Sequence, residues 1–295
     1  MSDPKELIFQ QDTWIRKTRR IPVNGDVLVK VGDSVRPETV VARGIVVNPE
    51  IRKVIVYGQL GIDPGDLEKY MLKDDGDEVK KDEVIAIHRS FFGRSTRVCR
   101  SPVDGTIEAV SGSSGSVLIR GKPIPVEAKA HIPGKVVEIV AGEGAIIECR
   151  GTFMHGVFGI GGETTGELAI PVSRSNDDLT SELISGEHKG KIIIGGSSAT
   201  VDALRKAVNT GVNGIVVGGV GQRDLTDFLG YEIGLGITGK EEVGLTLIIT
   251  EGFGTHPMDE RIFDLLRSSE GKRASIDGST QIRTRILRPE IILPT

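Results

Sequence analysis

An internal repeat constrains this chain most. The stretches VLVKVGDSVRPETVVARG, which begins at Val27, and MLKDDGDEVKKDEVIAIH, which begins at Met71, align at a constant offset of 44 residues. Each copy reads as a strand, a Gly-Asp turn and a second strand. Glycine supplies a positive φ, aspartate bonds its own backbone, and the flanking valines alternate with polar residues. The sequence therefore predicts two related β-hairpins.

A second repeat follows the first. At an offset of 30 residues it joins SPVDGTIEAV to HIPGKVVEIV and pairs Val110 with Val140 and Gly121 with Gly151. Between residues 21 and 170 short strands and evenly spaced turns recur without a long helical period, which indicates compact β modules. The pattern leaves open whether the repeats form one intertwined barrel or two.

These repeats also carry a family resemblance. GDVLVKVGDSVRPETVVARG and SPVDGTIEAV resemble the two halves of a barrel-sandwich hybrid, the fold of biotinyl and lipoyl carrier domains. The same fold forms the amino-terminal part of the RnfC and NqrA redox subunits and inserts in the large bacterial RNA polymerase subunits. A carrier domain would need a lysine in a Met-Lys or Asp-Lys-Ala motif, which the sequence lacks, so no covalent cofactor is expected. Cys99 and Cys149 are too few to hold a redox cluster.

The second half of the chain changes its period. Three times after Lys191 a short apolar run ends in glycines and is followed by an amphipathic stretch, as in KIIIGGSSATVDALRKAVNTG. Ser197 or Ser198 would cap the first helix, and Gly211 would end it. Three β–α units in sequence predict a small parallel sheet with helices packed on it, which is a Rossmann-like arrangement. The tail from Arg273 predicts closing strands.

Together these patterns predict an α+β multi-domain protein. All-β barrel-sandwich hybrid modules would come first, and a small Rossmann-like α/β domain with a parallel sheet would follow. The expected boundaries are a hairpin-repeat module over residues 1–98, a second β module over residues 99–172, intertwined with the first or separate, and the Rossmann-like domain with its closing strands over residues 173–295.

Glycines at the ends of the three predicted parallel strands suggest a ligand site. In open parallel sheets, ligands collect where loop backbones and helix N-termini converge beyond the carboxyl ends of the strands. An anionic small molecule, such as a nucleotide or an organic phosphate, is therefore one hypothesis. The other is that the glycines only permit tight turns and close packing of helices on the sheet. The candidate ligand-binding residues are Gly195, Gly196, Ser197, Ser198, Gly218, Gly219, Gly221, Gly252 and Gly254.

Candidate catalytic residues follow the third strand. Glu251 and His256 provide a carboxylate and an imidazole near the predicted ligand site, where they would act as acid or base. Glu251 would equally serve to cap the next helix or to pair with an arginine. The stretch GLGITG, at residues 234–239, fits a dinucleotide pattern but precedes a predicted strand where a helix is needed, so we assign it no site. The five histidines show no metal-ligand spacing, and no metal site is expected.

Two basic stretches allow a further interpretation. Arg16, Lys17, Arg19 and Arg20 follow Trp14, and residues 91–100 interleave phenylalanines with arginines, a pattern that could grip single-stranded nucleic acid. The formal net charge of −4 argues against this, and edge charges that prevent aggregation explain the arginines as well. The glycine-rich ribbon GTFMHGVFGIGGETTGEL would be an oligomer contact if its apolar side chains were exposed.

Composition narrows the functional class. No stretch approaches the roughly 20 apolar residues of a membrane helix, and the first 20 residues lack the apolar core of a signal peptide, so a cytoplasmic protein without a membrane partner is expected. Because no complete catalytic constellation is present, we expect a binding or scaffold protein that forms a homo-oligomer or a protein complex. The alternatives are an enzyme acting on a nucleotide-like or phosphorylated ligand at the glycines, and a transcription-associated module that binds RNA polymerase or nucleic acid.

Overall fold

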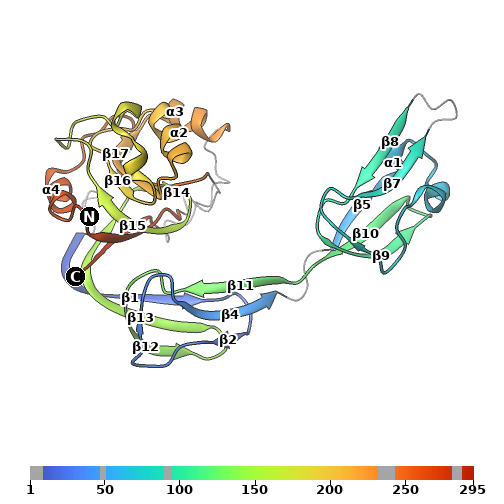
Figure 1. The fold of residues 1–295 in the computed structure, drawn as a ribbon, viewed down its shortest axis with the longest axis horizontal. Coiled ribbons are helices and arrows are strands. Elements are labelled where there is room, and N and C mark those ends of the chain that lie inside the picture. The colour runs from blue at the N-terminus through green and yellow to red at the C-terminus, as the bar shows by residue number, and fades with distance from the viewer. Residues whose placement is uncertain (1–8, 47–50, 90–94, 232–242, 281–287) are drawn as a thin grey trace, which may run out of the picture. The chain divides into compact units, whose positions relative to one another are not determined.

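A computed structural model describes residues 9–46, 51–89, 95–231, 243–280 and 288–295. The chain forms two compact units (Figure 1). Unit 1 contains the described parts of residues 1–20, 27–42 and 128–295, and unit 2 contains those of residues 21–26 and 43–127. Each unit is thus assembled from separated segments, whereas the three domains expected from the sequence were consecutive.

One large mixed sheet organises unit 1. Its strand order is β14-β18-β17-β16-β15-β19-β20-β13-β12-β3, and β1 pairs with β13 in addition. Strands β15 to β18 run parallel to one another, whereas the neighbouring pairs on both sides are antiparallel. The strands are β1 (Phe9–Arg20), β3 (Ser34–Val35), β12 (Gly134–Val140), β13 (Gly144–His155), β14 (Phe158–Ile160), β15 (Glu163–Ala169), β16 (Ile192–Ile194), β17 (Gly214–Val220), β18 (Thr246–Phe253), β19 (Arg273–Asp277) and β20 (Glu290–Pro294).

This sheet corrects the expected fold class. An N-terminal barrel followed by a separate Rossmann-like domain is wrong, because β3, β12 and β13 from the first half belong to the same sheet as the parallel strands. The closing strands β19 and β20 make the connection, since they pair antiparallel with β15 on one side and with β13 on the other. Such pairing between distant segments leaves no local signal in the sequence.

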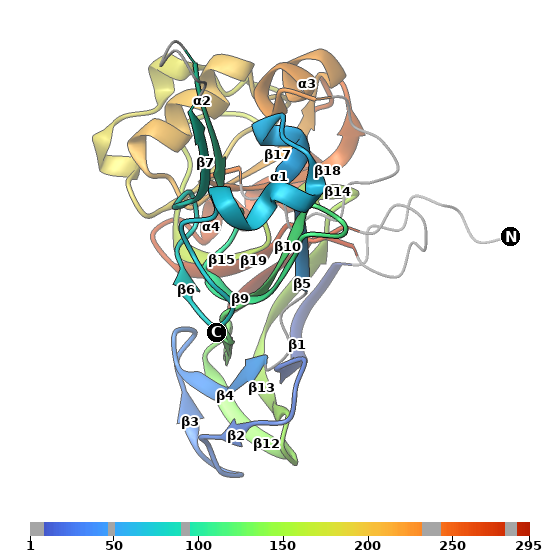
Figure 2. The same cartoon turned by 90° about the vertical axis from the view of Figure 1, so that its right-hand side faces the viewer.

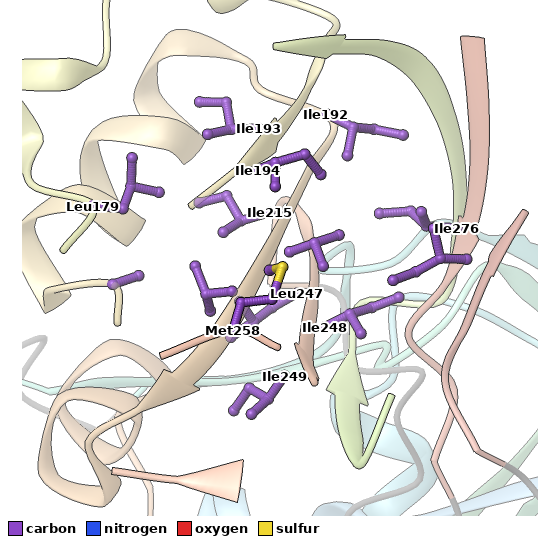
Figure 3. Close-up of a cluster of buried hydrophobic side chains, with 14 of the residues drawn as sticks. Leu179, Ile192, Ile193, Ile194, Ile215, Leu247, Ile248, Ile249, Met258 and Ile276 are labelled. Carbon is purple, nitrogen blue, oxygen red and sulfur yellow. The ribbon is translucent and has the colours of Figure 1, made fainter. Parts of the chain in front are cut away.

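The expected strand–helix units themselves are present. Helices α2 (Val201–Thr210), α3 (Gln222–Leu229) and α4 (Glu260–Ser268) follow β16, β17 and β18 and lie beside them (Figure 1). Thr200 caps α2 by accepting a hydrogen bond from the Ala203 N–H, so the expected cap at Ser197 or Ser198 is wrong because the helix begins later, at Val201. Gly211 ends the helix in the left-handed conformation, as expected. The isoleucine-rich strands pack with the helices in one apolar core, whose side chains include Ile192, Ile194, Ile215 and Ile248 (Figure 3). Two short 3-10 helices, η2 (Ser181–Leu183) and η3 (Gly186–His188), precede β16.

Unit 2 has a smaller core of its own. It is built on a four-stranded sheet of order β5-β10-β9-β6 and on the pair β7-β8, with β5, β10 and β9 side by side in Figure 2. The elements of unit 2 are β5 (Ile51–Ile55), α1 (Val56–Leu60), η1 (Pro64–Tyr70), β6 (Glu78–Val79), β7 (Val84–Arg89), β8 (Thr96–Arg100), β9 (Gly105–Ser111) and β10 (Ser116–Gly121). A three-stranded sheet has the order β11-β4-β2. The residues of its strands, β2 (Asp26–Val27), β4 (Val40–Val46) and β11 (Ile124–Lys129), are divided between the two units.

The first repeat is structural as well as sequential. Gly32 and Gly76 have φ values of 93° and 92°, and their N–H groups donate 2.8 Å hydrogen bonds to the carbonyls of Val136 and Ile107. In return, those two residues donate 2.9 Å hydrogen bonds to the carbonyls of the aspartates that follow the glycines. Each hairpin of the first repeat therefore docks on a strand of the second repeat, β12 in one case and β9 in the other.

The second repeat matches equally well, at a shorter offset than its sequence indicated. Gly105 corresponds to Gly134, at an offset of 29, because each glycine packs against a carbonyl group of the opposite strand. That carbonyl belongs to Arg120 in one copy and to Glu148 in the other, and these two residues correspond at an offset of 28. Both strand pairs carry a register shift at the same place. The two offsets differ from each other because the turn between the paired strands is one residue shorter in β12–β13 than in β9–β10.

A third strand completes the correspondence. Residues 16–20 of β1 pair with β13 in the register in which residues 51–55 of β5 pair with β10, so that Arg16 corresponds to Ile51 and Arg20 to Ile55. We call residues 16–20, 27–42 and 134–149 the outer copy, and residues 51–55, 71–86 and 105–121 the nested copy. The repeats thus form two modules, each with one hairpin of each kind, and one module is inserted within the other.

Candidate functional site

The structure brings the predicted ligand-binding glycines of β16 and β17 together. The N–H of Gly218 donates to the carbonyl of Gly196 at 2.9 Å, and the N–H of Gly219 donates to the carbonyl of Ser197 at 2.8 Å. Ser198 forms a parallel bridge with Gly219. The carboxyl ends of the parallel strands therefore meet as the sequence predicted.

Two loops of the chain cover these strand ends. One loop follows β15 and the other follows β18, and they meet where the N–H of Met258 donates to the carbonyl of Ser175 at 3.1 Å. A Cβ atom at Gly196 would overlap the carbonyl oxygens of Arg174 and Asp177. A Cβ atom at Gly218 would overlap the carbonyl oxygen of His256. The space left by the missing side chains is therefore filled by the main chain of the covering loops.

The remaining glycines also have structural roles. Gly195 lies against the side chains of Val217 and Leu179, and Gly219 lies under the carbonyl of Gly254. Gly252 and Gly254 have φ values of 153° and 111°, in the region that favours glycine. Gly221 precedes α3, and a Cβ there would approach the carboxylate of Asp224. This packing favours the second of the two hypotheses, in which the glycines permit close approach.

Glu251 holds the covering loop in place. Its Oε1 atom accepts hydrogen bonds from the N–H of Asp259 at 3.1 Å and from the hydroxyl of Thr250 at 3.3 Å. Asp259 in turn caps α4 by accepting from the N–H of Arg261 at 2.9 Å. The carboxylate of Glu251 therefore fixes Asp259, the N-cap residue of α4. This role is close to the helix-capping role that the sequence offered as the alternative to catalysis.

His256 is engaged with the main chain. Its Nε2 atom lies 2.9 Å from the carbonyl oxygen of Phe253, to which a ring N–H can only donate. Among the described residues no hydrogen bond joins His256 to Glu251, so the two candidate catalytic groups do not form an acid–base pair.

Polar residues before Leu179, which the sequence patterns did not indicate, complete the site. The hydroxyl of Ser197, which is almost fully buried, donates to Oδ1 of Asp178 at 2.5 Å. Asp177 accepts a hydrogen bond from the guanidinium of Arg174 at 3.0 Å. Burial alone would raise the pKa of Asp177, but the hydrogen bonds from Arg174 hold it below its usual value. The signal that could have indicated them is the polar run SRSNDD, which directly follows the second predicted β module.

A hollow of about 640 Å³ lies where the two loops meet the beginning of α4. Its charged lining comprises Arg174, Asp259, Glu260, Asp264 and Arg267. Arg174 is already paired with Asp177, and Arg267 donates to the carbonyl of Ser173 at 3.1 Å. Because acids outnumber cations in this lining, its charge does not favour an anionic molecule.

The basic stretch in β1 is neutralised by glutamates of unit 1. Arg16 bonds Glu148 at 2.6 Å, Arg19 makes two hydrogen bonds to Glu163 at 2.5 and 2.6 Å, and Arg20 lies 3.4 Å from Glu143. Lys17 pairs with Glu290. Four cations with four carboxylate partners leave little charge for phosphates, which weakens the nucleic-acid interpretation. In the second basic stretch, residues 91–94 lie outside the described residues.

Burial and charge alter the pKa values beside Arg19. Desolvation lowers the pKa of His131, which is 6% exposed and has a φ of 65°. Burial alone would raise the pKa of Glu163, but the hydrogen bonds from Arg19 and the charges of His131, Arg19 and Lys17 hold it below its usual range. This cluster connects β1, β15 and the loop before β12, and it serves the packing of unit 1.

The two cysteines are unsuited to thiolate chemistry. Burial raises the pKa of Cys99 and of Cys149 to about 11, so both remain protonated thiols near neutral pH. In the parts of the chain that the structure describes, no group of three His, Cys, Asp or Glu side chains could hold a metal ion.

The apolar ribbon is mostly core. Met154, Phe158 and Ile160 are buried in unit 1, and Val157 is exposed. The GLGITG stretch at residues 234–239 lies outside the described residues. Of the helices described, none is both long and apolar enough to cross a membrane.

Comparisons with protein-family models, curated proteins and solved structures yield no match to this chain.

Proposed function

We propose that this protein is a non-catalytic binding or scaffold protein of the cytoplasm, in which the β modules serve assembly. The observation that carries the proposal is the nested copy. Its strands β5, β6, β9 and β10 form a sheet of their own and add no strand to the 11-stranded sheet of unit 1. A complete second module with a separate core is a means of presenting a surface.

The candidate site supports a structural role for the residues that might otherwise act in catalysis. Glu251 binds the main chain before α4, and His256 binds the carbonyl of Phe253. The glycines at the strand ends accommodate the covering loops. These contacts supply no activated base and no open cradle for phosphates, so they argue for the scaffold over the enzyme alternative.

The test compares binding with turnover in the full chain. Cross-linking mass spectrometry with a native extract should place cross-links to other proteins on lysines of the nested copy, such as Lys53 and Lys80, more than on Lys191 in unit 1. An activity panel with nucleotides and phosphorylated metabolites is run in parallel. Turnover that Glu251→Gln abolishes while the melting temperature is retained would overturn the proposal in favour of the enzyme.

A further inference from the structure

Strand β5 leaves one edge of the nested copy open. It stands at the end of the order β5-β10-β9-β6, and among the described residues it pairs only with β10. Figure 2 shows it at the side of β10. An edge strand presents unpaired N–H and C=O groups to any extended segment that can pair with them.

The side chains on this edge are apolar where the outer copy is charged. Ile51 and Ile55 are 45% and 51% exposed, and they correspond to Arg16 and Arg20 of the outer copy. Proteins commonly protect open edges with charged side chains, and the outer copy follows that rule whereas the nested copy departs from it at both positions.

The partners of those arginines have changed as well. Arg16 pairs with Glu148, whose counterpart in the nested copy is Arg120, and Arg20 pairs with Glu143, whose counterpart is Gly115. The ring of Tyr57 covers Gly115 and extends the apolar edge beyond Ile55. The replacements therefore remove two ion pairs from the edge and leave an exposed strip formed by Ile51, Ile55 and Tyr57.

The charge beside this strip is positive. Lys53 lies between the two isoleucines on the same face, and no ion pair to it is found in the described chain. Arg120, opposite Ile51, is paired with Glu108 at 2.5 Å. Pairing β5 with itself about a twofold axis at Lys53 would bring two ammonium groups together, which is unfavourable for directly opposed residues. A partner with an acidic residue at that point complements the edge better.

We propose that β5 binds an extended segment of another protein by strand addition, and that the segment has the pattern apolar-x-acidic-x-apolar. Main-chain hydrogen bonds to the open edge supply affinity, and alternate side chains supply specificity. The apolar residues of the partner contact Ile51 and Ile55, and its carboxylate contacts Lys53. This inference rests on the proposed binding function and names the surface and the chemistry of the partner.

The test uses three fluorescein-labelled peptides, Thr-Thr-Ile-Thr-X-Thr-Ile-Thr-Thr, in which X is Glu, Thr or Lys. Fluorescence polarisation with the full chain should give the tightest binding for X = Glu. Ile51→Arg with Ile55→Arg, which restores the residue type of the outer copy, should weaken that binding about tenfold or more. Lys53→Glu should reverse the preference towards X = Lys. Hydrogen exchange should show that the peptide protects amides of β5.

Leu72→Arg is the matched control, because Leu72 is 56% exposed in the same module and lies beside β7, where its N–H donates to the carbonyl of Ile85, and it should leave peptide binding unchanged. Circular dichroism and melting temperature verify that each variant is folded. Equal affinity for the three peptides, or folded Ile51→Arg/Ile55→Arg protein that binds normally, would overturn the strand-addition site. A dimer of the protein that the Ile51→Arg/Ile55→Arg variant disrupts would also overturn this site, and so would a complex with a single-stranded oligonucleotide that the variant disrupts.

Failure of the site and failure of the scaffold function give different results. Protein cross-links on the nested copy that persist in the Ile51→Arg/Ile55→Arg variant would place the binding surface elsewhere and retain the function. Turnover that depends on Glu251 would remove the function itself.

Discussion

Gly105 and Gly134 occupy the same position in two copies of one β module. A Cβ atom at Gly105 would overlap the carbonyl oxygen of Arg120, and one at Gly134 would overlap that of Glu148. The two copies therefore share the same close contact between a glycine and the carbonyl of the opposite strand, and both copies need glycine at this position.

Replacement of these glycines should therefore destabilise the protein. We expect Gly105→Ala to lower the free energy of unfolding of unit 2 by about 1–3 kcal/mol, since main-chain atoms must shift to admit the methyl group. Urea unfolding followed by hydrogen exchange would assign the loss to unit 2. Gly65→Ala is the control, because a Cβ there meets no atom within 4 Å. Equal stability of the two variants would contradict the packing described.

The turn glycines should respond for a different reason. Gly76 has a φ of 92° and open space around its Cβ position, so Gly76→Ala should cost about 1–2 kcal/mol through backbone strain alone. Gly76→Asn should cost less, because asparagine tolerates the left-handed region better. Thermal unfolding of the two variants tests this order, and an alanine variant as stable as the parent protein would refute it.

The loop that follows β18 should lose order when the carboxylate of Glu251 is removed. Glu251→Ala deletes the acceptor for the Asp259 N–H and should reduce the free energy of unfolding by about 1–2 kcal/mol. Hydrogen exchange should become faster in residues 254–260 and remain unchanged in the nested copy. Glu260→Ala, at the first residue of α4, serves as the control. A stability loss that is equal in both variants would mean that Glu251 does not fix the loop.

Acid should weaken unit 1 in two steps. The pKa of His131 is lowered by burial, so the unfolded chain takes up a proton first and stability falls as the pH drops below about 6.5. The pKa of Glu163 is also lowered in the folded protein, and its contribution, present above about 4.5, is lost as the pH falls through the folded pKa.

Urea unfolding between pH 8 and about pH 2 measures both steps. His131→Asn, in which asparagine suits the φ of 65°, should remove the first step and keep the second. An unfolding free energy that stays constant between pH 7 and pH 5 in the parent protein would contradict the role given to His131.

The thiols should react only after unfolding. With their pKa raised to about 11 by burial, Cys99 and Cys149 should be modified slowly by a thiol reagent at pH 8 in the folded protein. Both should react rapidly in guanidinium chloride. Rapid labelling of either cysteine in the native protein would show that the structure opens around it.

The sequence predicted local features better than long-range pairing. The Gly-Asp turns at Gly32 and Gly76 and the end of α2 at Gly211 depend on a few adjacent residues, and their patterns were legible, whereas the N-cap was misplaced by two or three residues. The position of β19 and β20 between β15 and β13 depends on segments more than one hundred residues apart in the chain, for which a single sequence has no local signal.

The candidate site shows the same limit. Glycines at the ends of β16 and β17 indicated close approach, and the structure brings them together. What approaches Gly196 and Gly218 is the main chain at Arg174, Asp177 and His256, and no property of the glycines distinguishes a protein loop from a ligand. The register of the second repeat was misjudged because identical letters such as Gly121 and Gly151 aligned by chance.

The insertion of one module in another orders the steps by which the chain becomes folded. The two hairpins of the nested copy follow each other closely, with Ala86 and Gly105 at their ends, whereas those of the outer copy are interrupted between Ala42 and Gly134. Closing a short loop costs less entropy than closing a long one. During synthesis the inner module can be complete on the ribosome while the outer one still waits for its second half, and β1 waits longer for its partner β13 than β5 does for β10.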